Sequence, residues 1–185
     1  MNFEEAVMPH LDAAYNLARW LTRNEADAQD MVQEAYLRAL RFFGGFHGTD
    51  ARAWLLTIVR NTCYTWLKRS RSLELSGDFD EAVLTKESDE PDPEASHLLK
   101  VQSQLISEAI EKLPIEFREV VILRELEELS YKEIASITGI PIGTVMSRLS
   151  RARKRLFVCL RGVAHKPPAI KCQIKLVQAG NNRVA

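Results

Sequence analysis

Hydroxyl and cationic side chains recur along residues 142–160, and no acidic residue follows Glu133. At about 100° per residue they fall on one side of a helix, and apolar residues fall on the other. Cations bind phosphates, whereas hydroxyls and guanidinium groups hydrogen-bond base edges in the major groove of DNA. We therefore favour a DNA-reading helix over the alternative, an ordinary solvated basic face. The polar residues are Thr144, Ser147, Arg148, Ser150, Arg151, Lys154 and Arg155, and the apolar residues are Ile142, Val145, Leu149, Ala152, Leu156 and Leu160.

A helix that reads DNA has to be held by a second helix, and the residues before it supply one. Ala135 is small enough to let two helices cross closely, and Gly139 can adopt the left-handed conformation that a tight turn needs. Pro141 presets the backbone for a new helix, and Val145 sits where that helix would pack back on the first. The stretch from Ser130 to Leu160 therefore predicts a helix-turn-helix.

A second distinctive stretch is the predicted helix over residues 51–69, in which aromatic side chains alternate with cations. Aromatic rings can stack on exposed bases while the cations hold phosphates. The same spacing also fits a helix whose Trp54 and Trp66 belong to the core and whose cations are solvated, and both interpretations stay open. The apolar positions are Trp54, Leu55, Ile58, Val59, Cys63, Trp66 and Leu67, and the polar ones are Arg52, Arg60, Asn61, Tyr64, Lys68, Arg69 and Arg71.

Two further helices are expected at the N-terminal end. Residues 3–22 have apolar side chains at helical spacing, and Asn24 is a suitable N-cap for a helix that runs to about Phe42. Glycines 44 and 45 end that helix, and Asp50 could cap the helix that follows. The helix after Asn24 has a predicted core of Ala28, Met31, Val32, Ala35, Leu37 and Leu40, and an exposed side with Asp27, Asp30, Gln33, Glu34 and Arg38.

The helical pattern breaks in the middle of the chain. Residues 76–94 hold eight acidic residues and a single base, a composition typical of a flexible linker. Helical spacing resumes before Pro114 and again over 115–128, whereas the residues after Gly162 resemble a poorly ordered tail. The sequence thus predicts an all-α fold with two small helical domains joined by a flexible acidic linker, the C-terminal domain containing the helix-turn-helix. The expected bounds are 1–72, a linker over 73–96, 97–163, and a tail over 164–185.

Composition excludes several classes of protein. The 185 residues are 46% hydrophobic with a formal net charge of zero, which fits small globular domains. No apolar run could cross a membrane, and the early acids do not fit a signal peptide, so no membrane insertion is expected. Three widely spaced cysteines indicate a reduced, cytoplasmic setting, and four scattered histidines lack metal-ligand spacing. Because no catalytic triad, phosphate loop or carboxylate pair is found, we expect neither an enzyme nor a cofactor.

The order of these stretches resembles that of a bacterial RNA polymerase sigma factor. The motifs that carry the resemblance are DAQDMVQEAYLRALR, AWLLTIVRNTCYTWLKR and LPIEFREVVILRELEELSYKEIASITGIPIGTVMSRLSRARKRL. They are similar to the extracytoplasmic-function (ECF) group of the sigma-70 family, the minimal form with only the second and fourth conserved regions. The resemblance covers about residues 5–160, and the C-terminal motif is the more specific. It implies a factor that directs promoter-specific transcription initiation.

The resemblance also implies roles for particular residues. Asn61 matches the position that reads an unpaired base of the melted −10 element, and its carboxamide offers both a donor and an acceptor. Met146 stands where an arginine is frequent. The loop over residues 46–49 reads Phe-His-Gly-Thr where many members have Phe-Arg-Gly, which puts the base preference in doubt. Arg153 could reach phosphate from the flank of its helix or simply pack its stem. The −35-reading positions are Thr144, Ser147, Arg148, Arg151, Arg153, Lys154 and Arg155, and the −10-binding positions are Phe46, His47, Gly48, Thr49, Trp54, Arg60 and Asn61.

The partners implied are core RNA polymerase, promoter DNA and an anti-sigma factor. Asp30, Gln33 and Glu34 resemble the surface that docks on the β′ clamp helices, although a plain solvated helix face is the alternative. The β flap is a second expected contact, and the protein should be monomeric when bound to polymerase. The acidic linker resembles the segment that threads towards the RNA exit path, with a solubilising spacer as the alternative.

Two other classes of function remain to be distinguished. A repressor or activator would bind duplex operators without polymerase, usually as a dimer with half-sites about one helical turn apart. The aromatic and basic helix over 51–69 argues against it, because that helix suits single-stranded DNA better than a ligand pocket. A decoy that only binds the partners of a sigma factor is disfavoured by the intact basic recognition face.

Overall fold

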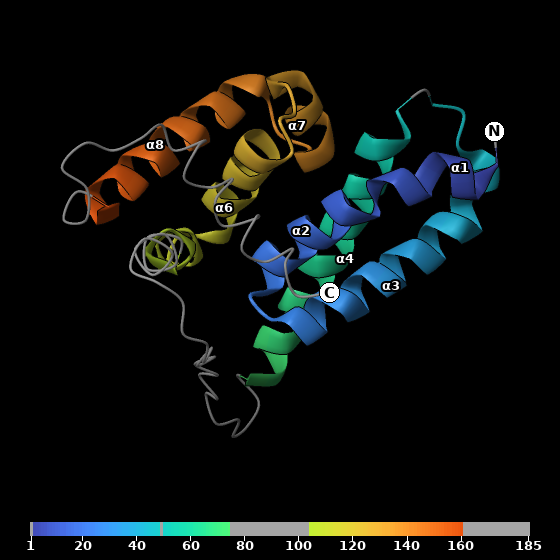
Figure 1. Cartoon of the computed structure of the whole chain (residues 1–185), viewed down its shortest axis with the longest axis horizontal. Coiled ribbons are helices and arrows are strands. Elements are labelled where there is room, and N and C mark those ends of the chain that lie inside the picture. The colour runs from blue at the N-terminus through green and yellow to red at the C-terminus, as the bar shows by residue number, and fades with distance from the viewer. Residues whose placement is uncertain (1, 49, 75–103, 161–185) are drawn as a thin grey trace, which may run out of the picture.

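The computed structural model describes residues 2–48, 50–74 and 104–160, with side chains described up to residue 70 in the second range. In these ranges the chain forms helices and turns and no strand, so the predicted all-α fold is confirmed (Figure 1). Most of the predicted linker over 73–96 and the whole predicted tail over 164–185 lie outside the described residues, as does Thr49.

Three helices, α2 (Leu11–Thr22), α3 (Glu25–Phe42) and α4 (Ala51–Glu74), pack against one another as an N-terminal bundle. The short α1 (Phe3–Val7) and the 3-10 turn η1 (Met8–His10) precede them. The single helix predicted over 3–22 is therefore wrong. Pro9 lies in η1 and has no N–H to donate to the preceding turn, so the α-helical bonding is interrupted there.

Both predicted N-caps of this bundle are confirmed. The Oδ1 atom of Asn24 accepts from the backbone N–H of Asp27 at 3.2 Å, and the Oδ1 atom of Asp50 accepts from that of Ala53 at 2.9 Å. A carboxylate or carboxamide at this position satisfies an N–H group that has no partner within the helix. The starts of α3 and α4 are thus fixed locally by the sequence, and the 3-10 turn η2 (Phe43–Gly45) ends the intervening helix.

The buried side of α3 is made of small residues. Ala28, Ala35 and Ala39 are fully buried, which lets the neighbouring helices approach closely. Leu37 and Leu40, predicted as core, are instead 54% and 52% exposed. They lie about 180° and 120° around the helix from Ala28, so packing by the alanine side necessarily turns both leucines outward.

The C-terminal bundle contains a helical stretch over 104–111, then α6 (Ile115–Val121), η3 (Ile122–Leu126), α7 (Tyr131–Thr138) and α8 (Ile142–Leu160). The helix predicted over 115–128 is shorter than expected. At its end the N–H of Glu127 bonds to the carbonyl of Ile122 at 3.1 Å, the wide spacing of a π-helical turn. Glu128 then takes a left-handed conformation with φ 56°, which ends the helix.

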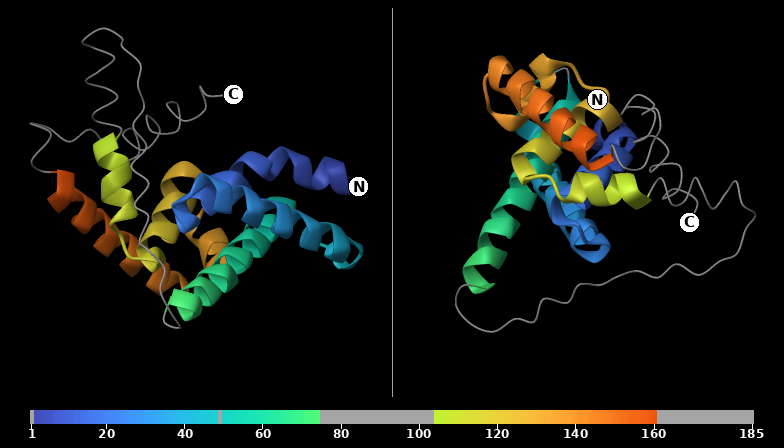
Figure 2. Two further views of the ribbon diagram at one scale, coloured as in Figure 1. Left: turned by 90° about the horizontal axis from the view of Figure 1, so that it is seen from below. Right: turned by 90° about the vertical axis from the view of Figure 1, so that its left-hand side faces the viewer.

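The two bundles touch each other. Helix α2 packs against α6 and η3, and α4 packs against α7, so the buried apolar residues of both bundles form one cluster (Figures 1 and 2). The composition of the linker predicted two separate domains and gave no indication of this contact.

Candidate nucleic-acid interface

The turn between α7 and α8 has the geometry that the sequence predicts. Ser130 and Glu133 form a reciprocal capping box at the start of α7. Gly139 has φ 68°, and its N–H donates to the carbonyl of Ala135 at 2.9 Å. A Cβ at Gly139 would meet no atom within 4 Å, so the backbone conformation and not crowding requires glycine. The carbonyl of Pro141 then accepts from Val145 at 3.1 Å and opens α8.

The apolar side of α8 holds the helix against the bundle. Val145, Leu149, Ala152, Leu156 and Leu160 are buried, as the helical spacing predicts. Ile142 lies on the same side of the helix but stays 41% exposed, because it is the first residue of α8 and the packed region begins one turn later. This packing directs the opposite side of the helix to solvent.

Most of the predicted −35-reading residues lie on that solvent side. Ser147, Arg151, Lys154 and Arg155 are exposed, and Thr144 is half-buried. The guanidinium of Arg155 also stands 4.9 Å from the centre of the Phe117 ring. Three cations and two hydroxyls therefore remain on one side of a helix that protrudes along the edge of the bundle (Figure 1).

The other two predicted −35 residues are engaged by acids of their own bundle. Arg148 Nη1 lies 3.4 Å from Glu119 Oε1, and Arg153 donates from Nε and Nη2 to Glu125 Oε1 at 3.1 and 2.5 Å. The hydrogen bond to Glu125 raises the pKa of Arg153. Both guanidinium groups are half-buried, so the structure separates them from the four exposed positions.

The loop before α4 is anchored by aromatic packing. The centroid of the Phe46 ring lies 4.8 Å from that of Trp54 and 6.0 Å from that of Phe43. Gly48 is close to that ring: a Cβ there would approach Phe46 Cε2 to 2.9 Å. Trp54 is half-buried in this cluster, which supports its role as core, whereas His47 is exposed.

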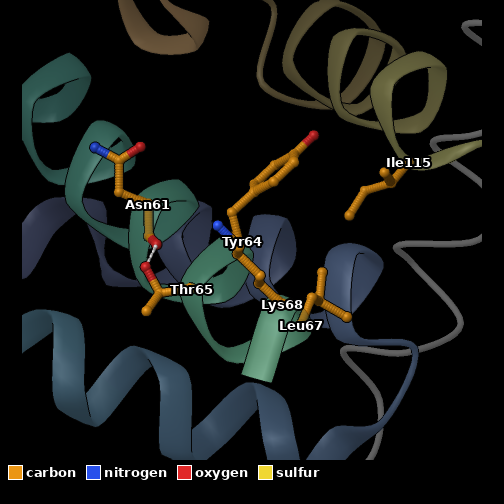
Figure 3. Close-up of a pocket in the computed structure, with 6 residues that line it drawn as sticks. All are labelled: Asn61, Tyr64, Thr65, Leu67, Lys68 and Ile115. Carbon is orange, nitrogen blue, oxygen red and sulfur yellow. Dashed lines mark hydrogen bonds between the residues drawn. The ribbon is translucent and has the colours of Figure 1, made fainter. Parts of the chain in front are cut away.

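Asn61 lies exposed on α4 beside a pocket of about 470 Å³. The pocket lies between α4 and the start of α6, where Ile115 faces the α4 side chains (Figure 3). The carboxamide oxygen of Asn61 accepts a hydrogen bond from Arg60 Nη1 at 3.4 Å. A polar side chain is thus presented beside a hollow whose wall is partly apolar, formed by Asn61, Tyr64, Thr65, Leu67, Lys68 and Ile115.

The residues predicted to face polymerase share one exposed side of α3. Asp30, Gln33 and Glu34 are all exposed, and Glu34 Oε1 accepts from Arg38 Nε at 2.7 Å. The misassigned Leu37 and Leu40 lie on the same side. The surface is therefore mixed apolar and acidic, which reasoning from polar residues alone did not reveal.

A buried carboxylate between the bundles was also missed. Glu119 on α6 is 0% exposed and accepts from Arg60 Nε at 2.8 Å and from the Tyr64 hydroxyl at 2.9 Å. Burial, together with the charge and hydrogen bond of Glu119, raises the pKa of Tyr64 well above its usual range. One feature of the sequence could have indicated this site: Glu119 comes directly before Val120 and Val121, in a predicted helix whose apolar spacing indicates burial.

A second acid and one arginine complete the contact between the bundles. Glu127, 6% exposed, binds Arg52 Nη2 at 2.6 Å and Asn16 Nδ2 at 3.3 Å. Arg118, 2% exposed, donates from Nη1 to the carbonyl of Trp20 at 2.8 Å. The bundles are therefore joined by charged hydrogen bonds as well as by apolar packing.

The described ranges show neither a metal-binding cluster nor a membrane-spanning helix. Residues 2–48, 50–74 and 104–160 contain no group of three or more His, Cys, Asp or Glu side chains that could hold a metal ion. None of the helices described there is long and apolar enough to cross a membrane. A helix-turn-helix with an exposed cation and hydroxyl face, joined to an aromatic and cationic helix, defines a DNA-binding protein.

Comparison with known proteins narrows this class to one family. Residues 6–73 match the model of sigma-70 region 2, and residues 103–156 match that of sigma-70 region 4. The chain is 37% identical over 139 residues to the ECF RNA polymerase sigma-E factor of Escherichia coli, covering 70% of this chain and 72% of that one. The chain belongs to the sigma-70 family of RNA polymerase sigma factors, in the ECF group.

Two further relatives agree with this placement. The ECF sigma factor SigE of Mycolicibacterium smegmatis is 31% identical over 158 residues, which cover 84% of this chain and 60% of SigE. The structure is similar to a chain in the co-crystal structure of the sigma factor RpoE with the anti-sigma factor NepR from Bartonella quintana. The TM-score is 0.70 at 31% identity, and the match covers 88% of this chain and 98% of that chain.

Proposed function

We propose that this chain binds core RNA polymerase and directs it to promoters, reading the −35 element as duplex and the −10 element as melted DNA. The observation that carries the proposal is the presence of both sigma regions in order, each with a surface suited to its part. Region 4 presents the exposed side of α8, and region 2 presents Asn61 on α4. The polymerase supplies the chemistry, so the chain itself needs no catalytic residue.

The −35 element is assigned to α8, with Arg151 as its most direct test. Arg151 is exposed on the solvent side, next to Ser147, Lys154 and Arg155. A guanidinium there can hydrogen-bond a guanine edge or a phosphate without breaking an internal contact. Arg148 and Arg153 also belong to the proposed set, but each must first leave the carboxylate that holds it.

The −10 element is assigned to α4 and the loop before it. Melting is favoured when unstacked bases are trapped in protein pockets, which offsets a few kcal/mol of unstacking per base. Asn61 lies beside a pocket, and the Phe46–Trp54 packing fixes the loop that carries His47 and Gly48. These features support base capture at this end of the molecule.

Core polymerase is assigned to the exposed side of α3. Asp30, Gln33 and Glu34 would pair with basic groups of the β′ clamp helices, and Leu37 and Leu40 would supply apolar area in the same contact. The β flap is assigned to region 4. The chain acts as a monomer on the polymerase, and its place of action is the cytoplasm, where the polymerase works.

Control by an anti-sigma factor is part of the proposal. The similar RpoE chain was crystallised with the anti-sigma factor NepR, and the likeness extends over nearly all of that chain.

We also assign the acidic residues 76–94 to a linker between a region 2 domain, 1–72, and a region 4 domain, 97–163. Truncation at Gly162 tests whether residues 164–185 have a role, and unchanged promoter-directed transcription and partner binding would exclude one.

A reconstituted transcription assay tests the proposal. Purified protein and sigma-free core polymerase receive a library of promoter fragments, and initiation at a defined subset should depend on the protein. Arg151→Ala should weaken −35 binding by about 1–3 kcal/mol for a lost base contact. Lys112→Ala is the matched control, because Lys112 is an exposed cation that pairs with Glu108 and does not belong to α8. Equal promoter selectivity in the two variants would remove the assigned role of α8.

The same assay separates the rival class. A repressor or activator would bind specific duplex DNA alone, would not bind core polymerase and would not support initiation. Asn61→Ala gives a second discrimination, because it should impair open-complex formation more than duplex binding. Equal loss in both measurements would exclude Asn61 from base capture.

A further inference from the structure

The cationic face of α4 is already occupied by carboxylates. Arg60 and Tyr64 both bind Glu119, and Arg52 binds Glu127. The Arg60 guanidinium also stacks 4.4 Å from the centre of the Tyr64 ring, which fixes its direction towards Glu119. We call the contact of these five residues the seam.

The seam is a matched charge pattern and not a single chance contact. Arg52 and Arg60 are eight positions apart on α4, which places them two turns or roughly 12 Å apart along one side. Their acidic partners, Glu127 and Glu119, are also eight positions apart, in the opposite order. The acidic row therefore runs antiparallel to the cationic row, and the two meet in register.

Burial makes these contacts specific. A buried carboxylate is costly unless it is paired and hydrogen-bonded, and Glu119 at 0% exposure meets that condition through Arg60, Tyr64 and Arg148. Two of those donors, Arg60 and Arg148, belong to the proposed −10 and −35 surfaces. One side chain thus engages both promoter-reading surfaces while the bundles are together.

A phosphate and a carboxylate compete for the same donors. Guanidinium groups bind either anion with similar hydrogen-bond geometry, and a phenol hydroxyl donates to both. Single-stranded DNA that tracks along α4 would need the positions that Glu119 and Glu127 now hold. DNA on this face and contact between the bundles therefore exclude each other.

We propose that the seam is an autoinhibitory contact, in which Glu119 and Glu127 of region 4 stand in for DNA phosphates on α4 of region 2. Opening of the seam uncovers Arg52, Arg60 and Tyr64 and is favoured by any ligand that binds the open form better. This inference rests on the proposed function insofar as α4 is the face that binds melted DNA. It adds Arg52 and Tyr64 to that face, and it identifies Glu119 and Glu127 as the groups that compete with DNA for it.

The separation of the bundles can be measured with two fluorescent labels. Gln29→Cys on α3 and Ser136→Cys on α7 place labels at exposed positions, one in each bundle. Cys159→Ser and Cys172→Ser remove the other two thiols of the chain, and Cys63 can stay because burial raises the pKa of its thiol to about 12. Energy transfer then reports the closed and open forms of the full chain without polymerase.

The ligand is a random-sequence single-stranded DNA of about 12 nucleotides. Its addition should lower energy transfer. The double variant Glu119→Gln with Glu127→Gln should show low transfer from the start and bind the DNA more tightly. If about 10% or less of the wild-type protein is open, the gain in affinity is about tenfold or more. Glu108→Gln with Glu116→Gln removes the same charge from the same bundle and should leave both readings near wild type.

A charge swap covers the case in which the buried glutamines disturb folding. Arg52→Glu alone should lower energy transfer, and Arg52→Glu with Glu127→Arg should restore it, because the pair is re-formed with opposite sign. Restoration supports the seam, whereas equal transfer in wild type, single and double variants overturns it. Binding of DNA with the labels still at the closed distance overturns the competition.

These results are separable from the proposed function. If the protein does not support polymerase-dependent initiation but single-stranded DNA still opens the seam, the promoter role is refuted and the autoinhibitory contact is supported. Normal initiation without any opening by single-stranded DNA would defeat the seam alone.

Discussion

Arg118 offers the most demanding test of how the two bundles are held together. Its guanidinium is 2% exposed, and it donates to the carbonyls of Trp20, Glu111 and Leu113 at 2.8–2.9 Å. Burial, helped by the nearby charge of Arg23, lowers the pKa of Arg118, but a guanidinium stays protonated in proteins. The buried positive charge is thus hydrogen-bonded to three backbone carbonyls, one of them from the other bundle.

Arg118→Leu keeps the apolar volume and removes all three donors. Each hydrogen bond to a charged group contributes about 1.5–3 kcal/mol, so the gross loss is about 4.5–9 kcal/mol. Because the leucine buries no charge, the desolvation cost of the guanidinium disappears, which offsets several kcal/mol of that loss. We therefore expect the free energy of unfolding to fall by about 2–4 kcal/mol, measured by urea titration with circular dichroism on the full chain.

Arg124→Leu is the graded control for this measurement. Arg124 is half-buried and donates to one carbonyl, that of Leu129, at 2.7 Å within its own bundle. We expect a loss of about 1 kcal/mol there. A free energy of unfolding for Arg118→Leu within about 0.5 kcal/mol of wild type, the usual range for surface changes, would refute the reasoning that the three hydrogen bonds of Arg118 are a net stabiliser.

Three further outcomes follow from particular residues. Gly139→Ala should lower the free energy of unfolding by about 1–2 kcal/mol through left-handed strain alone, since no atom crowds the new Cβ, and a loss near zero in a urea titration would contradict this. Leu37→Ala should weaken binding to core polymerase in a pull-down or titration while leaving urea stability nearly unchanged; a large stability loss would instead place Leu37 in the core. Because burial raises the pKa of Cys63 from 9.0 to about 12, the unfolded chain loses that proton first, so this group's contribution to stability declines as pH rises above 9. In the folded protein at pH 8, a thiol-alkylating reagent should therefore modify Cys159 well before Cys63, and equal rates would show that Cys63 is accessible.

Local chemistry explains what could be predicted. Asn24 and Asp50 begin their helices because each side chain satisfies an N–H group three residues on, and Gly139 makes its turn because only its backbone tolerates φ 68° easily. The apolar side of α8 likewise follows from helical spacing. These features depend on residues close together in the chain, so the pattern of the sequence is sufficient.

Errors arose where a choice between two sides of a helix depended on distant residues. On α3 both an alanine side and a leucine side were available, and the partners α2 and α4 selected the alanines because small residues permit close packing. Pro9 and the wide turn at Ile122 broke helices that had unbroken apolar spacing. Periodicity gives the side of a helix that can be buried, but not which side a neighbour will accept.

By itself the sequence determined the all-α class, the helix-turn-helix and the hydroxyl and cation face of α8. It also determined the family, because those motifs stand in a fixed order. Only the tertiary structure decided that Glu119 meets Arg60, and that Glu127 meets Arg52, across separations of 59 and 75 residues. A carboxylate and a guanidinium attract at short range, but which pairs come within that range depends on how two bundles dock, and no local pattern encodes the docking.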